Sequence, residues 1–309
     1  MKIITLTLNP AFDTHCQTDT LMLHHENFAS ITASHAGGKG INLSRALAVN
    51  GTDHVTVVVV GEENSESFLR PLQKAGLRLR TISVPGRIRE NLTIHTGCGQ
   101  ETRISFGGFP APHDLLPQLK ELLQCEIEDD TILTVTGRNT EGLSKEEIKN
   151  YLKKLSHKGV RLVIDSRSFN LNDLTELKPW LIKPNQEEIS QYLGRSVQDF
   201  EQVRSAAQEL HTQGIANVMV SLGPQGALLV CKEGTMIAVP PEINARSTIG
   251  AGDSSIAGFL SAAIKGYSAE ESLKTAVAYG TAACLTDGSL PPLPSDIAAI
   301  EAKIKTTVY

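Results

Sequence analysis

The chain has 309 residues, of which 20% are charged, and a formal net charge of −5. This length can bury a full hydrophobic core, and the mild negative charge excludes a broad basic surface for nucleic acid or an acidic membrane. The five cysteines are scattered and lack metal-site spacing, which indicates free thiols in a reducing compartment. No apolar run is long enough for a signal sequence or a membrane span, so we expect a cytoplasmic protein without membrane or nucleic-acid partners.

Short apolar, β-branched runs alternate with helical patterns along the chain. The runs are KIITLTL (2–8), HVTVVVV (54–60), TILTVTG (131–137), VRLVID (160–165), PWLIKPN (179–185) and NVMVSLG (217–223), and helical patterns include residues 41–49, 65–75 and 202–213. This alternation predicts an α/β fold whose mostly parallel sheet is covered by helices on both faces. No linker or repeat divides the chain, so we expect a single domain over residues 1–309.

Two stretches break this alternation. Residues 14–35 and 85–107 lack helical periodicity, and ENLTIHTGCGQETRISF (90–106) has the pattern of two strands around a glycine-containing turn. We expect the two stretches to form a small second sheet that projects from the main domain. Ligands of an open parallel sheet bind at the carboxyl ends of its strands, and the polar loop residues Asn9 and Asp13 follow the first run.

The segment TIGAGDSSIAG (248–258) opens an apolar, buried helix and is the first candidate site. Glycine is costly at a helix start unless the backbone must adopt a positive φ or approach a ligand closely. The turn over Gly250, Ala251 and Gly252 therefore presents free N–H groups that suit an anion. Asp253 beside them suits a hydroxyl about to attack a phosphate; a plain glycine turn with an acidic first helical turn is the alternative.

A second glycine cluster, HAGGKGINLSRALAVNG (35–51), is neither a Walker A loop nor a dinucleotide-binding fingerprint. Gly37, Gly38 and Gly40 permit close approach of the backbone to a ligand. Asn42 can both donate and accept a hydrogen bond, which suits a polyol. The alternative interpretation is a tight turn that caps a helix.

Three further motifs each have a functional and a structural interpretation. In PGRIRENLTI (85–94), Arg87 and Arg89 are expected on one face of a strand, where they would bind a phosphate or protect an edge strand. In KPNQEEI (183–189), Asn185 and Glu188 would hold hydrated Mg²⁺ beside phosphates or form a capping box. SLGPQGALL (221–229) would admit a nucleotide or form an ordinary hairpin.

Six motifs occur in order over nearly the whole chain: TLNPAFD, GGKGIN, GRIREN, KPNQEE, SLGPQG and GAGDS. In this combination the chain resembles the PfkB branch of the ribokinase-like carbohydrate kinases. The resemblance implies a three-layer αβα sandwich with a small β-sheet lid and a homodimer that forms through the lids. It also implies an ATP- and Mg²⁺-dependent kinase that phosphorylates a primary hydroxyl of a ketohexose monophosphate.

The resemblance also assigns a role to each matching residue. Asp253 is the implied catalytic base, with Gly250, Ala251 and Gly252 as the anion hole for the transferred phosphate. The implied acceptor-binding residues are Asp13, Gly37, Gly38, Lys39 and Asn42 for the sugar, and Arg87 and Arg89 for its phosphate. The implied ATP side consists of Lys183, Asn185, Glu188, Ser221, Gly223 and Gly226, with Asn185 and Glu188 contacting Mg²⁺ through water.

The acceptor is the least determined part of this interpretation. The stretch SFGGFPAP (105–112) is more similar to kinases of fructose 1-phosphate, whereas TGRNTEG (136–142) lacks a serine of the family pattern and has Arg138 instead. A fructofuranose ring carries a primary hydroxyl at each end, so fructose 6-phosphate and tagatose 6-phosphate are alternatives. A non-catalytic sugar-phosphate sensor is a further alternative. No role is assigned to His24, His25 or His35.

Overall fold

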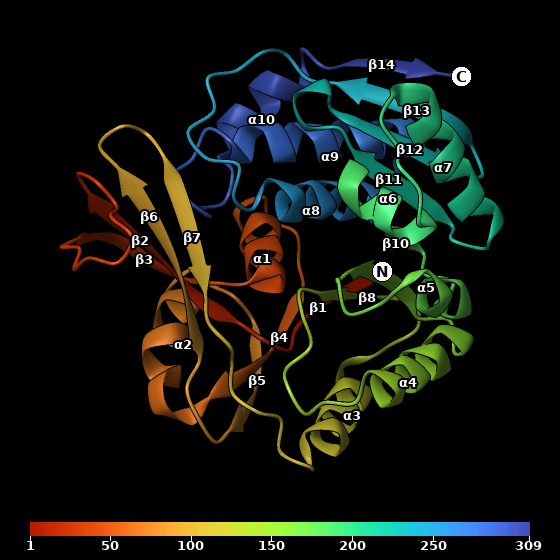
Figure 1. Cartoon of the computed structure of the whole chain (residues 1–309). Helices are drawn as coiled ribbons and strands as arrows, with labels where there is room; N and C mark the ends of the chain where they lie inside the picture. Colours follow the sequence, from red (N-terminus) through yellow and green to blue (C-terminus); the bar gives the residue numbers. More distant parts are fainter.

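The computed structural model describes residues 1–309, in which a long sheet carries helices on both faces (Figure 1). Its strands are β1 (Lys2–Thr7), β4 (Val55–Gly61), β5 (Leu79–Val84), β8 (Thr131–Thr136), β9 (Arg161–Asp165), β10 (Leu181–Ile182), β11 (Asn217–Ser221), β12 (Ala227–Cys231), β13 (Gly234–Val239) and β14 (Lys305–Val308). They form a ten-stranded sheet in the order β14-β13-β12-β11-β10-β9-β8-β1-β4-β5. Neighbours from β11 to β5 are parallel, and β12, β13 and β14 add an antiparallel edge.

The helices divide between the two faces of this sheet. One hydrophobic core contains side chains of α2 (Ser65–Lys74), α3 (Leu115–Glu126), α4 (Lys145–His157), α5 (Leu171–Leu177), α6 (Gln186–Leu193) and α7 (Phe200–Thr212). The other core contains side chains of α1 (Lys39–Val49), α8 (Ala251–Ala263), α9 (Ala269–Ala283) and α10 (Pro294–Glu301). The buried neighbours Ile3 and Ile4 of β1 belong to different cores, because successive strand residues face opposite sides. The predicted mostly parallel sheet between two helical layers is thus confirmed. None of the helices combines the length and the apolar character needed to cross a lipid bilayer.

A second, smaller sheet projects to one side of the molecule (Figure 1, red and golden-yellow strands). It consists of β2 (Ala11–Thr18), β3 (Ser30–Gly37), β6 (Arg89–Thr96) and β7 (Glu101–Ser105), in the order β3-β2-β6-β7. The two strands predicted in 90–106 pair antiparallel as β6 and β7. The expected polar loop after the first strand was wrong, because β2 already begins at Ala11 by pairing with Arg89. Asp13 therefore lies within the small sheet.

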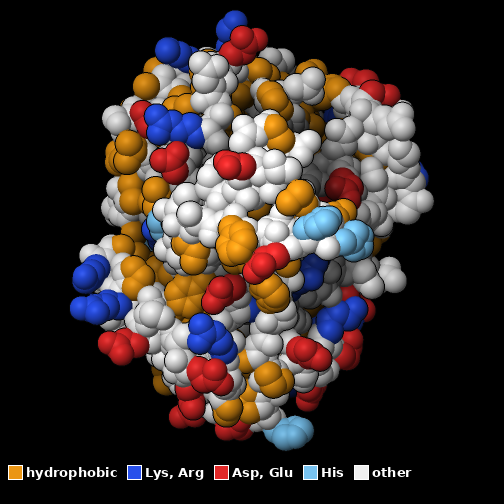
Figure 2. All heavy atoms as spheres, turned by 60° about the vertical axis from the view of Figure 1, so that its left-hand side comes forward, with side chains coloured by type: hydrophobic (Ala, Val, Ile, Leu, Met, Phe, Trp, Pro, Cys, Tyr) orange, Lys and Arg blue, Asp and Glu red, His pale blue; other side chains and the backbone are white.

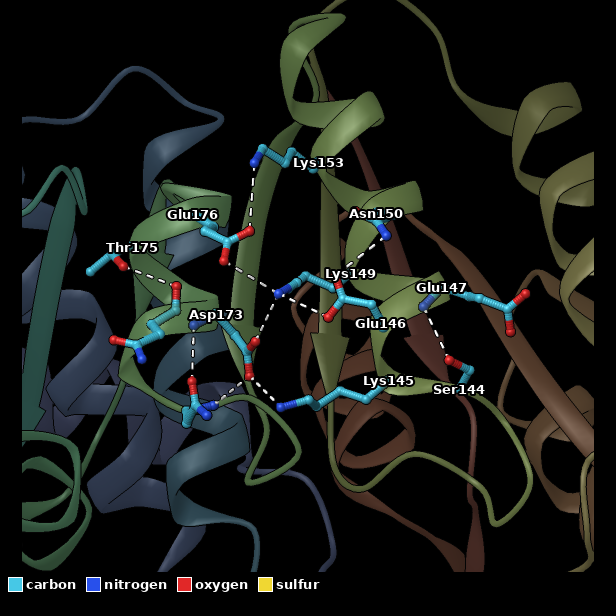
Figure 3. A network of polar contacts seen from close by, with 12 residues as sticks. Ser144, Lys145, Glu146, Glu147, Lys149, Asn150, Lys153, Asp173, Thr175 and Glu176 are labelled. Carbon is cyan, nitrogen blue, oxygen red and sulfur yellow. Dashed lines mark hydrogen bonds and ion pairs between the residues drawn. The ribbon is translucent and has the colours of Figure 1, made fainter.

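A charged network joins α4 to α5 (Figure 3). The buried ammonium group of Lys149 contacts Asp173 at 3.1 Å, Glu176 at 3.4 Å and Glu146 at 3.0 Å. Lys145 contacts the other carboxylate oxygen of Asp173 at 2.8 Å. Because α5 follows β9, this network fixes the segment that leaves the carboxyl end of that strand.

Candidate active site

The amino-terminal ends of α1 and α8 meet near the carboxyl ends of the parallel strands. Gly250 caps α8 in the left-handed conformation, with φ 77°, and Gly38 precedes α1 with φ 107°. The side-chain amide of Asn42 donates to the carboxylate of Asp253 at 2.9 Å. The backbone N–H groups of Gly252 and Asp253 have no acceptor within the chain. Two of the predicted glycine motifs are therefore brought together, and free donors lie beside Asp253.

Asp253 is a buried carboxylate among other charges. It is 6% exposed, and burial raises the pKa of its carboxyl to about 7, with Lys39, Asn42 and Lys183 acting in the opposite direction. Lys39 contacts Asp165 at 3.0 Å. Burial disfavours ionisation of Asp165 as well, but Lys183 and Lys39 hold the pKa of that carboxyl below its usual range. Asp253 can therefore take up and release a proton near neutral pH.

A cavity of about 560 Å³ opens beside the start of α8. Its lining includes all of the predicted ATP-side residues except Glu188, together with apolar side chains such as Met219, Ile243 and Val277. Lys183 lines it while only 8% exposed, and makes no ion pair or hydrogen bond. A buried ammonium group without a partner favours binding of an anion. These residues fit a nucleotide, with apolar groups for the base and Lys183 and the end of α8 for the phosphates.

Gly226 shows why the hairpin at this cavity needs glycine. Its φ is 89°, and a Cβ atom at that position would lie 1.9 Å from the carbonyl oxygen of Ala238. The segment SLGPQGALL does form a hairpin of β11 and β12, as one interpretation predicted, and Ser221 and Gly223 of that hairpin line the cavity. The hairpin and the nucleotide interpretations are therefore compatible.

Asn185 and Glu188 form the capping box of α6. The Asn185 side chain accepts the Glu188 N–H at 2.8 Å, and the Glu188 carboxylate accepts the Asn185 N–H at 3.1 Å. Arg167 donates to the other carboxylate oxygen of Glu188 at 3.2 Å. Because these oxygens are already hydrogen-bonded, the pair fits contact with Mg²⁺ through water better than direct coordination.

The small sheet contributes Asp13 to the same region. Its Oδ1 atom accepts hydrogen bonds from Asn91 at 2.8 Å and Arg103 at 3.2 Å. Gly37 is needed beside it, because a Cβ atom there would lie 2.2 Å from Asp13 Oδ2. Side chains of β6 and β7 thus hold the carboxylate of Asp13, and Gly37 of β3 leaves room for it.

Arg89 lies in the strand that the prediction expected. Arg89 begins β6 and donates to Asn9 at 3.0 Å and to Asn91 at 2.8 Å. Burial lowers the pKa of Arg89 the most; the charge of Asp13 opposes this, and the charges of Arg138 and Arg103 add to the lowering. Like charges this close indicate a place for an anion.

Arg87 was expected on the same strand face as Arg89, and this expectation was wrong. Arg87 lies in the loop before β6, where the backbone of residues 86–88 crosses close to Gly61 and Ile88 is tied to Asn64. Its side chain is 60% exposed and pairs with Glu90 at 3.5 Å.

The sequence motifs did not identify Asp165, Asn91 or Arg103 as part of the site. Asp165 ends the predicted strand 160–165, so its position at a strand carboxyl end was a usable signal. Asn91 and Arg103 reach Asp13 only through the pairing of β6 with β2 and β7, which no local pattern specifies. Arg138 was noted as a departure from the family pattern, and it follows β8 at the same edge.

Comparisons with known proteins agree with this arrangement. The model of the pfkB family carbohydrate kinases matches residues 26–296. The chain is 32% identical to 1-phosphofructokinase of Escherichia coli K12 over 278 residues, which cover 90% of this chain and 89% of that enzyme. It is 33% identical to the ATP-dependent 6-phosphofructokinase isozyme 2 of the same organism over 294 residues, 94% of each chain.

Solved structures show the same similarity. Phosphofructokinase-2 from Escherichia coli in complex with substrates and products superposes with a TM-score of 0.91 at 31% identity, over 98% of this chain and 99% of that chain. The tetrameric inhibited form of that enzyme superposes with a TM-score of 0.87, over 98% of each chain. The chain therefore belongs to the pfkB family of carbohydrate kinases and is a phosphotransferase with an alcohol group as acceptor.

Proposed function

We propose that the chain transfers the γ-phosphoryl group of ATP to a primary hydroxyl of a ketohexose monophosphate, with fructose 1-phosphate as the first candidate. The observation that carries this proposal is Asp253, a buried carboxylate at the free amino-terminal end of α8, directly after Ala251 and Gly252, which line the cavity. The names of the relatives support a sugar-phosphate kinase, and they include kinases of two different fructose phosphates. The acceptor therefore has to be argued from the site.

Asp253 is the proposed general base. It orients the attacking hydroxyl and accepts its proton, a role generally worth about 10²–10⁴-fold in rate. The free N–H groups of Gly252 and Asp253 face the position where negative charge develops. Transfer in such a site depends mainly on position and charge. Lys183 and Lys39 would neutralise phosphate oxygens, and Asn185 and Glu188 would hold a hydrated Mg²⁺ that neutralises the phosphate chain of ATP.

The acceptor phosphate is proposed to bind at Arg89, with Arg138 and Arg103 beside it. Arg138 makes no ion pair, and Arg103 pairs only with Asp13, so the positive charge of this group exceeds its negative charge. Free sugars and nucleosides would leave this charge unmatched. Asp13, Gly37, Gly38 and Asn42 would then contact the sugar hydroxyls. The whole chain acts as one kinase unit in this proposal, and the small sheet acts as the lid.

A homodimer through the small sheet is also proposed. Large hydrophobic side chains are exposed on the β2–β3 connection, on β3 and β7, and directly after β7: Met22, Leu23, Phe28, Ile31, Ile104 and Phe106. Figure 2 brings this side of the molecule forward and shows hydrophobic side chains gathered on the exposed face. Several large hydrophobic side chains exposed on one side of a molecule favour an interface there. The mass in solution of the wild type and of a Phe28→Ser, Ile31→Ser variant tests it; a monomeric wild type contradicts it.

The first experiment measures ADP release from Mg-ATP with fructose 1-phosphate, fructose 6-phosphate, tagatose 6-phosphate and free fructose, compared by kcat/KM. We expect turnover with the phosphosugars, fructose 1-phosphate ahead, and little with free fructose. Folded protein that binds a phosphosugar but releases no ADP would contradict the kinase and support the sensor.

A further inference from the structure

His15 has a buried ring nitrogen without a hydrogen-bond partner. The residue follows Asp13 by two positions in β2, so both side chains lie on the same face of the small sheet. His15 is 8% exposed, and its Nδ1 atom lies 3.0 Å from Nε2 of His95. Its own Nε2 atom contacts no donor or acceptor. Buried polar atoms in proteins are nearly always hydrogen-bonded, so this nitrogen is suited to a partner that the chain does not supply.

The unpartnered nitrogen faces the segment that borders the start of α8. A Cβ atom placed on Gly288 would lie 2.9 Å from His15 Nε2, and one placed on Gly250 would lie 3.7 Å from Ser289. Ser289 Oγ and Asn42 Oδ1 are also buried without a partner. Asn42 and Ser289 thus lie beside the Gly250 turn, and His15 Nε2 lies beside Gly288, the chain neighbour of Ser289. The three unpartnered polar atoms come from separate elements near the start of α8.

The neighbours of His15 determine which hydrogen-bonding role Nε2 can take. Glu101 Oε2 lies 3.8 Å from Nδ1 of His95, which favours a proton on that nitrogen. Nε2 of His95 is then an acceptor, so Nδ1 of His15 donates to it and Nε2 of His15 carries a lone pair. Burial lowers the pKa of His15 the most, and the charge of His95 lowers it further. The charges of Asp13 and Glu101 act in the opposite direction. The ring is therefore neutral at neutral pH.

We propose that His15 is a further acceptor-binding residue, whose Nε2 atom accepts a hydrogen bond from a hydroxyl group of the sugar. His95 and Glu101 are positioning residues in this proposal, because they keep that nitrogen unprotonated. The inference rests on the proposed function and adds a specificity-determining contact to it. Binding sites built to pair with a hydroxyl discriminate strongly against ligands that lack it. His15 therefore helps to distinguish phosphosugars that differ in one ring hydroxyl, such as fructose 6-phosphate and tagatose 6-phosphate.

The kinetic test compares His15→Phe, which keeps a ring but removes the acceptor, with His15→Gln, which keeps an acceptor. We expect His15→Phe to raise KM for the preferred phosphosugar by about 5- to 150-fold, the effect of one unsatisfied buried hydrogen bond, with KM for ATP unchanged. His15→Gln should recover part of the loss, and His95→Phe should show a smaller rise. The matched control is His35→Gln, on the neighbouring strand β3, whose ring has no buried unpartnered nitrogen. Thermal unfolding of each variant shows that it is folded.

A spectroscopic readout separates this inference from the proposed function. The ¹⁵N signal of His15 Nε2, assigned by its loss in His15→Gln, is expected at an unprotonated position in the free protein and should move when fructose 1-phosphate, fructose 6-phosphate or tagatose 6-phosphate binds. A signal that moves with none of them, or unchanged KM values in a folded His15→Phe variant, overturns the inference. Absence of turnover in the wild type would contradict the proposed function alone, because the signal still reports binding.

Discussion

The side-chain amide of Asn42 in α1 donates to the carboxylate of Asp253 in α8 over 2.9 Å. The two residues are far apart in sequence, and each lies in the first turn of its helix. Two helix amino-terminal ends therefore meet at one carboxylate. Such ends favour negative charge, yet burial keeps the pKa of Asp253 near 7. A carboxyl group in this situation is suited to exchange a proton with a bound hydroxyl.

The first prediction concerns the pH dependence of catalysis. A general base acts when deprotonated, so kcat/KM of the wild type should rise with pH and level off above about 7, the pKa of Asp253. Asp253→Asn should lose at least about 10²-fold in kcat and keep its affinity for both substrates. Steady-state kinetics between pH 5.5 and 9 and calorimetric titration check this. Near-normal turnover by the asparagine variant would remove Asp253 from the base role.

The charge of Asp253 should also affect stability, which should fall as pH rises whereas activity increases. The folded-state pKa of Asp253 lies above that of the unfolded chain, so the folded state binds more protons and wild-type stability declines as pH rises from about 4 to about 7. Asp253→Asn removes this decline. Its Tm should exceed that of the wild type by a few degrees at pH 8, and the difference should shrink at pH 5. A lower Tm of the variant at pH 8 would contradict this account.

Arg87 and Arg89 form a matched pair of variants. Arg89 is partly buried beside Arg138, whereas Arg87 is exposed and pairs only with Glu90. Arg89→Ala and Arg138→Ala should each raise the phosphosugar KM by about 10- to 150-fold, corresponding to about 1.5–3 kcal/mol for a hydrogen bond to a charged group. Arg87→Ala should change it less than twofold. Equally large rises of this KM in Arg87→Ala and Arg89→Ala would show that both arginines bind the acceptor phosphate, and an unchanged KM in Arg89→Ala would remove that residue from the phosphate site.

The sequence allowed much of the fold to be predicted because its signals are local. Hydrophobic runs, glycine turns and first-turn acids are read within a few residues, and α8 with Gly250 and Asp253 was predicted in this way. The family motifs extended this to residues as distant as Asp13 and Asn42. The prediction failed for Arg87, because the path of the backbone determines where its side chain lies. A spacing of two residues places Arg87 and Arg89 on one face only if both lie in a strand.

Long-range pairing explains the residues that were missed. Arg103 reaches Asp13 because β7 pairs with β6 and β6 with β2, and a shift of either register by one residue would turn its side chain to the other face. Asp165 becomes part of the site only when Lys39 from α1 reaches it across the sheet edge. Neither contact has a sequence pattern of its own.

The last prediction concerns Asp173, at the centre of the network between α4 and α5 (Figure 3). Burial disfavours its charge, but Lys145, the Asn170 N–H group and Lys149 hold the pKa of the carboxyl below its usual range. The stability gained from a depressed pKa is present above the unfolded-state value of about 3.9 and is lost as pH falls below it. Asp173→Asn should therefore destabilise the protein by about 1.5–3 kcal/mol at pH 7.

Denaturant unfolding at pH 7 and near pH 3.5 measures this difference, which should shrink at the lower pH because the unfolded wild-type chain then binds a proton at this carboxyl while the folded state still holds it charged. Glu147→Gln is the control, since Glu147 lies on the same helix α4 but its carboxylate makes no ion pair, and Figure 3 shows it pointing away from Lys149. That variant should match the wild type at both pH values. An Asp173→Asn protein as stable as the wild type at pH 7 would show that desolvation of the network cancels its ion pairs, as happens in some buried salt bridges.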